Sequence, residues 1–432
     1  MNYNSWGNYP IVNPSNIWHI YWRDQEIPFN NVDNFFLCYA QGKSYGDSCL
    51  NENGILLDTK KLNRFISFDL QRGVIRCEAG ITFAEILQII VPNNWFLPVV
   101  PGTQFISLGG AIANDIHGKN HHHAGTFGRY VKCFELLKSD GTRLFCSPEH
   151  NSGLYKATIG GLGLTGFITW AEIELIPIKN PYLNVEYIKF KNINDFYQLN
   201  ESSEKYFTYT VAWLDCASNG MSLGRGIFMR ANHSEQEINL SSPRRAFSIP
   251  CYFPSFVLNR YTIKTFNRLY YHKQHVLIKE EGLHYQSFFF QLDAIYHWNR
   301  IYGKKGFLQY QCIVPAEDQS IVNDLLKRIV KSGQGSFLSV LKTFGTVHSP
   351  GLLSFPKQGI TLALDFPNRG QKTLSLLEEL DVIVMKNNGR VYPAKDARMS
   401  SEAFKNYYPN WDSFQKYKDP KFNSNFWRRV MR

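Results

Sequence analysis

Short apolar runs separated by glycine dominate the first third of the chain. Runs of apolar, β-branched and aromatic residues bounded by Gly, Asn or Asp are typical of β-strands. They occur at Asn34–Ala40, Gly54–Asp58, Val74–Glu78, Val131–Lys138 and Phe167–Ile176. Apolar residues at helical spacing favour helices over Thr82–Val91 and Ser152–Ile159. Together these runs predict a mixed α+β domain over residues 1–177.

The pattern changes after residue 177. Strands are predicted at Leu183–Lys191, Phe207–Leu214, Gly306–Val314, Phe337–Phe344 and Ile360–Phe366. Two helices are predicted from apolar faces, one with Ile321, Val322, Leu325, Leu326, Ile329 and Val330 before Gly333, the other with Leu376, Leu377, Leu380, Ile383 and Val384 before Gly389. This order predicts a second domain, residues 178–385, with an antiparallel sheet covered by helices on one face. Residues 386–432 return with the segment Gly389–Asp396, and an aromatic-rich helical tail is expected after it.

The segment 241–275 has weak periodicity. It mixes prolines and aromatic residues with the cations Arg260, Lys264, Arg268 and Lys273. Two interpretations stay open: a mobile loop that touches a membrane or a lipid tail, and an ordinary insertion packed on the second domain.

The net positive charge of the chain is compatible with several classes of partner. The chain has 47 Lys and Arg against 36 Asp and Glu, a net charge of +11. Nucleic acid, an anionic membrane surface and a phosphorylated substrate all suit that charge, as does plain solubility. No RRM, KH or helix-turn-helix pattern is present, so no nucleic-acid partner is predicted.

Cysteines and the N-terminus restrict the class further. Eight cysteines are scattered without a close pair, which favours free thiols over a disulfide framework or a zinc site. The first residues lack the basic and apolar parts of a signal peptide, and no apolar run has the length of a membrane span. We expect a soluble or surface-attached protein.

Three glycine-rich segments point to a ligand with phosphate groups. Glycine lets the backbone approach a ligand closely, and clustered N–H groups bind phosphate oxygens. The segments are Gln41–Asp47, Pro101–Asn120 and Gly160–Gly166. A tight turn explains any one of them, but three in one domain favour a large phosphate-bearing cofactor.

Other chemistries fit less well. Gly160–Gly166 matches G-x-G-x-x-G by letter, yet a strand-like run follows where a nucleotide-binding Rossmann site needs a helix. His117, His121, His122 and His123 lack the converging ligands of a metal site, so no metal is predicted. A P-loop is absent from the sequence, and no cysteine lies in a recognisable nucleophile motif.

At the second glycine segment the chain resembles a known family. Pro101-Gly102-Thr103 and Gly109–Asn120 resemble the decaprenylphosphoryl-β-D-ribose 2-oxidases, flavoproteins of the vanillyl-alcohol-oxidase superfamily. The resemblance continues through Ser44–Asp47, Gly160–Gly166, Tyr209–Asp215, Trp298–Arg300, Gly306–Gln311, Asp365–Pro367 and Tyr392–Arg398. It implies a two-part FAD-binding domain of the para-cresol-methylhydroxylase type, with the C-terminal residues returning to it around a substrate domain.

The resemblance also implies a cofactor site. FAD contacts are expected from Tyr39, Ala40, Gln41, Gly42, Lys43, Ser44, Tyr45, Gly46, Gly102, Ser107, Leu108, Gly109, Gly110, Asn114, Ile116, His117, Ile168 and Tyr392. Many superfamily members attach FAD through a histidine of the first loop. Here that loop reads Gly42-Lys43-Ser44, so non-covalent FAD is predicted.

The family's reaction oxidises the 2-hydroxyl of a polyprenylphosphoryl ribose, and a partner NAD(P)H-dependent keto-reductase completes epimerisation to arabinose in bacterial cell-envelope biosynthesis. Lys395 matches the family's essential lysine, as a base or as a fixed cation. Tyr45 and His117 are further candidates for proton handling. Substrate-pocket positions match Lys119, Trp213, Gln309, Gln311, Lys342 and Phe344.

Departures and rivals remain. Mycobacterial members have a pocket cysteine where this chain has Ala363, so cysteine-directed inhibition is not expected. A sugar-lactone or alditol oxidase that uses oxygen is the alternative on the same fold, and a non-enzymatic basic protein is a third reading. The expected location is the cytoplasm or the inner-membrane surface, with the periplasm reached only by export with a partner.

Overall fold

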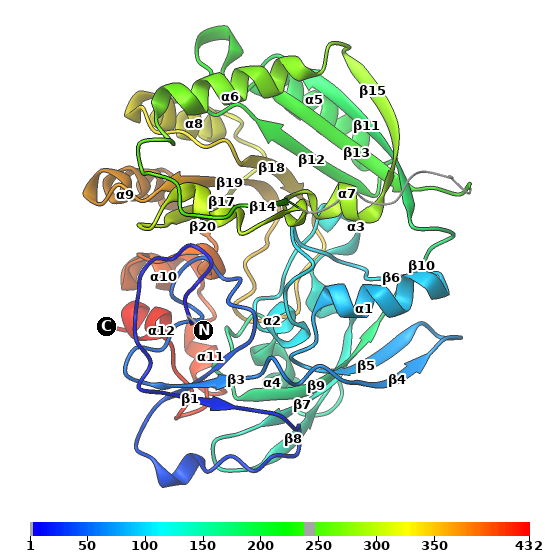
Figure 1. Cartoon of the computed structure of the whole chain (residues 1–432), viewed down its shortest axis with the longest axis vertical. Coiled ribbons are helices and arrows are strands. Elements are labelled where there is room, and N and C mark those ends of the chain that lie inside the picture. The colour runs from blue at the N-terminus through cyan, green and yellow to red at the C-terminus, as the bar shows by residue number, and fades with distance from the viewer. Residues whose placement is uncertain (1–2, 237–246) are drawn as a thin grey trace.

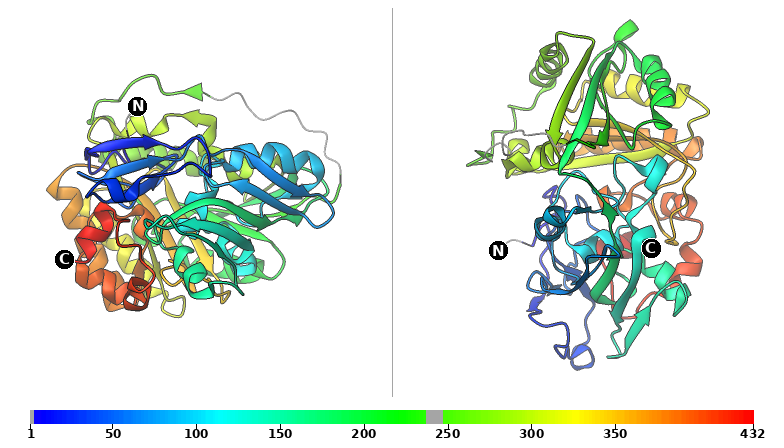
Figure 2. Two further views of the ribbon diagram at one scale, coloured as in Figure 1. Left: turned by 90° about the horizontal axis from the view of Figure 1, so that it is seen from below. Right: turned by 90° about the vertical axis from the view of Figure 1, so that its right-hand side faces the viewer.

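The structure, a computed structural model, describes residues 3–236 and 247–432. Figure 1 shows two halves, one above the other. The lower half holds the first part of the chain and the C-terminal helices, and the upper half holds a large sheet. The right-hand view of Figure 2 shows the same division from the side.

The lower half contains two small sheets. A three-stranded parallel sheet has the order β1 (Asn16–His19), β3 (Ile55–Asp58) and β2 (Phe36–Tyr39). A five-stranded antiparallel sheet has the order β4 (Phe65–Asp69), β5 (Val74–Glu78), β9 (Phe167–Glu174), β7 (Val131–Leu137) and β8 (Arg143–Cys146). The accompanying helices are α1 (Phe83–Ile90), α2 (Leu108–Ala113), α3 (His121–Ala124) and α4 (Ser152–Thr158). The short strands β6 (Trp95–Phe96) and β10 (Ile176–Pro177) pair with each other.

The upper half is an eight-stranded sheet whose paired strands are antiparallel. Its order is β15 (Ile278–His284), β11 (Tyr182–Phe190), β13 (Gly226–His233), β12 (Tyr209–Leu214), β18 (Ser339–Phe344), β19 (Gly359–Pro367), β17 (Phe307–Val314) and β20 (Arg390–Val391). On one face lie α5 (Ile193–Glu204), α8 (Ser320–Ser332) and α9 (Gln371–Lys386). The predicted antiparallel sheet with helices over one face is confirmed.

Strand alternation gives the two faces of the upper sheet opposite characters. On β17, Leu308, Tyr310 and Cys312 belong to the apolar core shared with α8 and α9. Because successive side chains of a strand point to opposite sides, Gln309 and Gln311 face the other way. We call that side, which looks toward the lower half, the inner face.

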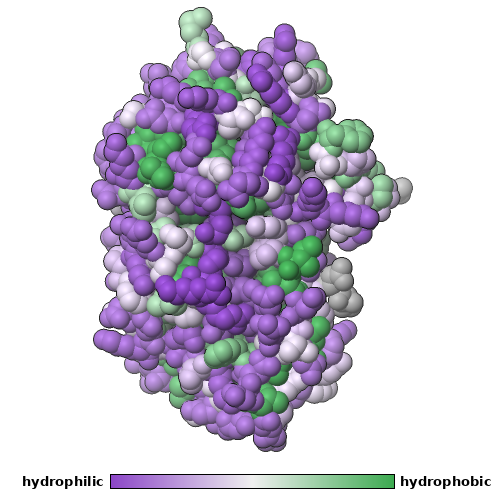
Figure 3. Space-filling view, turned by 90° about the vertical axis from the view of Figure 1, so that its left-hand side faces the viewer, coloured by the Kyte–Doolittle hydropathy of each residue, from purple (hydrophilic) through white to green (hydrophobic). Residues whose placement is uncertain are grey.

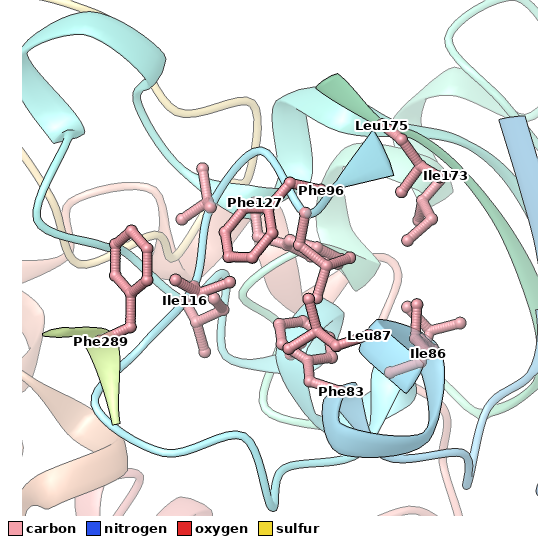
Figure 4. Close-up of a cluster of buried hydrophobic side chains, with 14 of the residues drawn as sticks. Phe83, Ile86, Leu87, Phe96, Ile116, Phe127, Ile173, Leu175 and Phe289 are labelled. Atoms are coloured by element: carbon pink, nitrogen blue, oxygen red, sulfur yellow. The ribbon is translucent and has the colours of Figure 1, made fainter. Parts of the chain in front are cut away.

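One apolar core joins the two halves. It includes Phe83 and Leu87 of α1 and Ile173 of β9, together with Phe289 of α7 (Tyr285–Phe289) in the upper half. Figure 4 shows Ile116 between this α1 cluster and Phe289. The halves are therefore packed as one body at this point.

The C-terminal residues bind the lower half. After α9 the chain forms α10 (Ser401–Tyr407), α11 (Trp411–Gln415) and α12 (Asn425–Val430), which confirms the helical tail. The Phe36 N–H donates to the Lys421 carbonyl at 2.8 Å. Arg429 forms ion pairs with Asp47 at 2.7 Å and with Asp396 at 2.9 Å. The division at residues 177 and 385 stays a proposal.

Residues next to the helices explain where α1 begins and where α8 and α9 end. Thr82 caps α1 in a capping box with Glu85, and Gly333 ends α8 in the left-handed conformation, with φ of 66°. After α9 the left-handed residue is Asn388, with φ of 52°, and the Gly389 N–H donates to the Val384 carbonyl at 2.7 Å. Residues 160–166 run from a turn after α4 into β9, so the rejection of a Rossmann site there is confirmed.

The segment that lacked periodicity contains a helix that sequence analysis missed, α6 (Arg260–Lys273). Its buried residues are only Ile263, Asn267 and Tyr271, one per turn, with a polar residue in the middle. Many exposed aromatic residues obscure that stripe. Unlike α5 and α8, this helix lies on the inner-face side of the sheet (Figure 2, right). Residues 241–246 lie outside the described residues.

Gly46 tests the contact between the first glycine loop and residues 386–432, which we call the C-terminal return. A Cβ at Gly46 would lie 1.6 Å from the Asp396 carbonyl oxygen. We expect Gly46→Ala to lower the free energy of unfolding in urea by about 1–3 kcal/mol, because the backbone must move. Gly335→Ala is the matched control, since its Cβ would meet its nearest atom at 3.4 Å. Unfolding of Gly46→Ala at the wild-type urea concentration would contradict this contact.

Candidate functional site

Lys395 lies where the C-terminal return meets the first glycine loop. It ends the short 3-10 turn η7 (Pro393–Lys395), directly after β20. Its Nζ is 3.8 Å from the centroid of the Tyr45 ring, an attractive cation–π geometry. The Tyr45 N–H donates to the Ala394 carbonyl at 2.9 Å. Two candidate residues 350 positions apart in the sequence are thus in contact.

The surroundings of Lys395 lower its pKa to about 7. Burial is the main cause, because it disfavours the charged form. The Lys342 cation lowers the pKa further, and the Asp365 carboxylate raises it. A lysine so tuned can exchange a proton near neutral pH.

Asp365 is a site residue that sequence analysis did not single out. It is 1% exposed, and burial raises its pKa to about 7. Gln309 Nε2 donates to Oδ1 at 2.5 Å, whereas Oδ2 has no hydrogen-bond partner among the described residues. A lone carboxylate inside an otherwise buried strand was the available signal.

His117 is held neutral beside these groups. Burial is the first cause of its pKa lying well below the usual value, and Lys342, His121 and Lys395 act in the same direction. Its Nε2 is 2.9 Å from Gln311 Nε2. Because an amide nitrogen only donates, the imidazole Nε2 accepts and Nδ1 carries the proton. Nδ1 is buried without a partner in the described part of the chain, so it is free to donate to a ligand.

Two further lysines reach the same region. Lys119 Nζ donates to the carbonyls of Phe288 and Phe289 at 3.1 and 3.2 Å. Lys342 Nζ lies 3.5 Å from the Gly118 carbonyl. Burial lowers the pKa of Lys119 to about 7 and that of Lys342 to about 8. Among the described residues, a carboxylate raises the pKa of Lys395 alone of these three.

Sheet register places the remaining predicted pocket residues on the inner face. Trp213 pairs with Val340, Val340 with Ala363, and Ala363 with Gln311. These four side chains form one row across four strands, so its ends lie about 14 Å apart. Phe344 closes one side, with its ring 4.8 Å from that of His117. The structure brings all of these predicted residues to one face.

The first glycine loop presents free backbone donors, and the second leaves open space at two glycines. The N–H groups of Gln41, Gly42, Lys43 and Ser44 donate no hydrogen bond to any described residue. A Cβ at Gly102 would meet no atom within 4 Å, and one at Gly110 would meet only the Ser107 hydroxyl. These open approaches fit the diphosphate of FAD.

Several predicted cofactor residues have structural partners of their own. The Tyr39 hydroxyl donates to the Asn4 carbonyl at 2.7 Å. The Tyr392 hydroxyl donates to the Asn114 carbonyl at 2.9 Å, which ties the C-terminal return to the second loop. Ile116 and Ile168 are buried in the apolar core, as is Leu108. Contacts of these residues with the cofactor stay predictions, and so does its non-covalent attachment.

Other remaining predicted residues shape the loops. Lys43 Nζ lies 3.6 Å from the Trp6 ring centroid, and burial lowers its pKa to about 8. The Ser107 hydroxyl caps α2 by accepting from the Gly110 N–H at 3.2 Å. The Gly109 N–H donates to the Ala79 carbonyl at 2.7 Å. Ala40 follows β2 directly, at the entry to the first loop.

The neighbouring histidines point to different partners. His121 stacks on Phe344 at 4.4 Å, whereas His122 Nε2 lies 3.0 Å from the Phe207 carbonyl. Within the described ranges no three His, Cys, Asp or Glu side chains gather as metal ligands. A cavity of about 320 Å³ lies away from the inner face, between residues 345–358 and Tyr408. None of the predicted site residues lines it.

Comparisons with known proteins agree with an FAD-binding fold. Residues 33–147 match the FAD binding domain family. The chain is 34% identical over 385 residues to the decaprenylphosphoryl-β-D-ribose oxidase of Mycolicibacterium smegmatis, covering 86% of this chain and 83% of that protein. It is 30% identical over 371 residues to a Streptomyces coelicolor protein named for the mprA 5′ region, covering 81% of this chain and 100% of that protein. The human Delta(24)-sterol reductase is 30% identical over 114 residues, 26% of this chain and 22% of that protein.

The fold, the loops and the matched domain define an FAD-dependent oxidoreductase with a two-part flavin-binding domain. Within that class, the extent and identity of the first match place the chain in the decaprenylphosphoryl-β-D-ribose oxidase family.

Gly102 allows a test of the cofactor site. We expect Gly102→Val to leave the unfolding temperature of the apoprotein unchanged, because its Cβ lies in open space. We expect FAD to bind at least about tenfold more weakly, because the side chain fills the approach to the loop. Titration of apoprotein with FAD, followed by flavin fluorescence, measures this. Equal affinity of the variant and the wild type would remove Gly102 from the site.

Proposed function

We propose that this chain oxidises the 2-hydroxyl of a polyprenylphosphoryl-β-D-ribose to the 2-keto sugar. The observation that carries the proposal is the convergence of Lys119, Lys342 and Lys395 on the inner face, beside neutral His117. The name of the Mycolicibacterium relative supports the same substrate class.

The charge of the site suits a phosphate ester of a sugar. Lys119 and Lys342 are half-buried cations that face no carboxylate acting on their pKa values among the described residues. A phosphate group near them would offset their charge and raise both pKa values. We assign the phosphate to these lysines, and the ribose to the region among Gln311, Tyr45 and Lys395.

Hydroxyl oxidation removes a hydride and a proton. FAD held at the two glycine loops would supply the acceptor for the hydride of C2 of the sugar. The proton leaves the 2-hydroxyl, and neutral Lys395 can take it. Burial raises the pKa of Tyr45 well above its usual value, so its hydroxyl stays protonated. Tyr45 therefore orients the substrate oxygen as a hydrogen-bond donor and does not serve as the base.

The rest of the proposed pathway follows from the product. A 2-keto sugar becomes the arabinose epimer when a hydride is added from the other side. We assign that step to a partner NAD(P)H-dependent keto-reductase. No helix in the described ranges is both long and apolar enough to cross a membrane.

Flavin reduction tests the reaction directly. We expect anaerobic polyprenylphosphoryl-ribose to bleach the flavin absorbance of the wild type. Lys395→Ala should bleach at least about a hundredfold more slowly, because general base catalysis contributes at least this factor. Lys395→Arg is the matched control that keeps a cation but cannot act as a base near neutral pH. Bleaching by a free sugar or lactone alone would favour the alternative oxidase, and equal rates in all variants would contradict the role of Lys395.

The pH dependence separates the two roles of Lys395. Asp365 raises the lysine pKa, so Asp365→Asn should move it below about 7. If neutral Lys395 is the base, the rate rises with pH through this pKa, and that rise shifts to lower pH in the variant. If a lysine cation is required, the rate falls with pH, and the fall shifts to lower pH.

The rate constant of anaerobic flavin reduction against pH measures the effect. Because Asp365 and Lys395 interact, the observed values belong to the pair. A profile that stays in place, or moves to higher pH, would show that Asp365 does not act on Lys395.

A further inference from the structure

One part of the surface combines unusual exposure with unusual charge. About half of the exposed large apolar side chains among the described residues lie between residues 247 and 296. They are Phe247, Tyr252, Phe256, Tyr261, Phe266, Leu269, Val276, Leu277, Ile278 and Tyr296. Three are far from buried: Tyr261 is 77% exposed, Phe256 74% and Leu269 67%. Large apolar patches on a surface mark interaction sites.

An overlapping stretch of the sequence, residues 238–279, holds much of the excess positive charge, and its described part 247–278 carries Arg260, Lys264, Arg268 and Lys273. No Asp or Glu lies between Glu237 and Glu280. Seven cations do: Arg244, Arg245, Arg260, Lys264, Arg268, Lys273 and Lys279. Seven of the net +11 charges of the chain therefore come from a tenth of its length.

Helix α6 is anchored on one side and unpartnered on the other. Asn267 Nδ2 donates to the Asp215 carboxylate at 3.0 Å and to the Ser336 carbonyl at 3.1 Å. Ile263 is buried. On the outer side, Lys264 and Arg268 are exposed, and neither forms an ion pair with any described residue. The helix is thus a fixed scaffold that presents cations and apolar groups together.

This surface adjoins the site. The ring of Tyr270 on α6 packs at 4.6 Å against that of Trp213 on the inner face. Strand β14 (Phe247–Ser248) pairs with β16 (Ile295–Tyr296). The ring of Tyr296 lies 6.3 Å from that of Phe105, just after Gly102 in the second glycine loop. We call the exposed residues of 247–278 together with Tyr296 the α6 surface.

We propose that the α6 surface docks onto an anionic phospholipid bilayer. Cations attract the anionic headgroups, and the aromatic and aliphatic side chains enter the interfacial layer. Exposed Leu, Val and Ile side chains contribute to that insertion, whereas a nucleic-acid surface has no use for them. The left-hand side of the molecule in Figure 1, seen face-on in Figure 3, is mostly hydrophilic with small, separate apolar patches.

Docking would bring the inner face, which adjoins the α6 surface, close to the bilayer. This consequence for the substrate rests on the proposed function. A polyprenyl tail stays in the bilayer, and the phosphate and ribose then need only reach the inner face beside Trp213. The protein would collect its substrate from the membrane surface without releasing the lipid into water.

Sedimentation with vesicles tests the docking with the full-length flavoprotein. One vesicle type contains phosphatidylethanolamine and phosphatidylglycerol, and the other contains only phosphatidylcholine. We expect binding to the anionic vesicles alone, and less of it at high salt. Lys264→Glu with Arg268→Glu should reduce binding at least about tenfold, because each cation near such a surface contributes. Tyr261→Ser with Leu269→Ser should reduce it too, and the remaining binding should then be removed fully by salt.

Matched controls lie on the other side of the sheet. Lys327→Glu with Lys331→Glu has the same spacing on an exposed face of α8, and Val382→Ser removes an exposed apolar residue of α9. Both should bind vesicles like the wild type. Equal loss in these controls, equal binding to both vesicle types, or binding to RNA but not to vesicles would overturn the proposal.

A second readout separates docking from the reaction. With a short-chain, water-soluble analogue of polyprenylphosphoryl-ribose, the α6 variants should bleach the flavin absorbance at the wild-type rate. With the long-chain substrate in anionic vesicles they should be slower by about the loss in binding. If the wild type oxidises the short-chain substrate but does not bind vesicles, the docking proposal alone is wrong. If it binds vesicles but oxidises no ribose lipid, the proposed function alone is wrong.

Discussion

The site depends on three half-buried lysines, of which only Lys395 is stabilised as a cation by a carboxylate, Asp365, among the described residues. Taking an ammonium group out of water is costly unless a partner offsets its charge. The chain supplies Asp365 for Lys395, and carbonyl groups for Lys119. The unmet charge favours an anionic ligand at the inner face. Burial, with Lys342 and Lys395 acting in the same direction, keeps His117 neutral, and its Nδ1 carries the proton.

The fold holds the side chains of the inner face in place through the residues that pack behind them. Strand alternation places Gln309 and Gln311 on the inner face only because their neighbours are bound in the core under α8 and α9. The C-terminal return closes over the first loop through Arg429, Asp47 and Asp396. This packing lets the site keep a buried lysine with a lowered pKa in place without a rearrangement of the surrounding residues.

Local pattern predicted much of the fold, and its failures have clear causes. Five strands of the upper sheet, β11, β12, β17, β18 and β19, were predicted within two residues of their ends, whereas β13, β15 and β20 were not predicted. Helix α6 was missed since its buried stripe has one residue per turn, Asn267 among them, while its aromatic residues face outward. Asp365 was passed over because its importance depends on a lysine 30 positions later in the chain. Helix α5, with only Ile193 and Phe196 as large buried apolar residues, was also not anticipated.

The sequence by itself determined the class of the protein. Glycine loops, strand periodicity and family strings are local, and each can be read without neighbours in space. It also named the lysines, the histidine and the glutamines that gather at the site. Only the tertiary structure decided that Tyr45 and Lys395 touch, that Gln309 binds Asp365, and that α6 leaves its cations unpaired. Such facts depend on burial and on contacts between distant segments, and both arise only when the chain closes on itself.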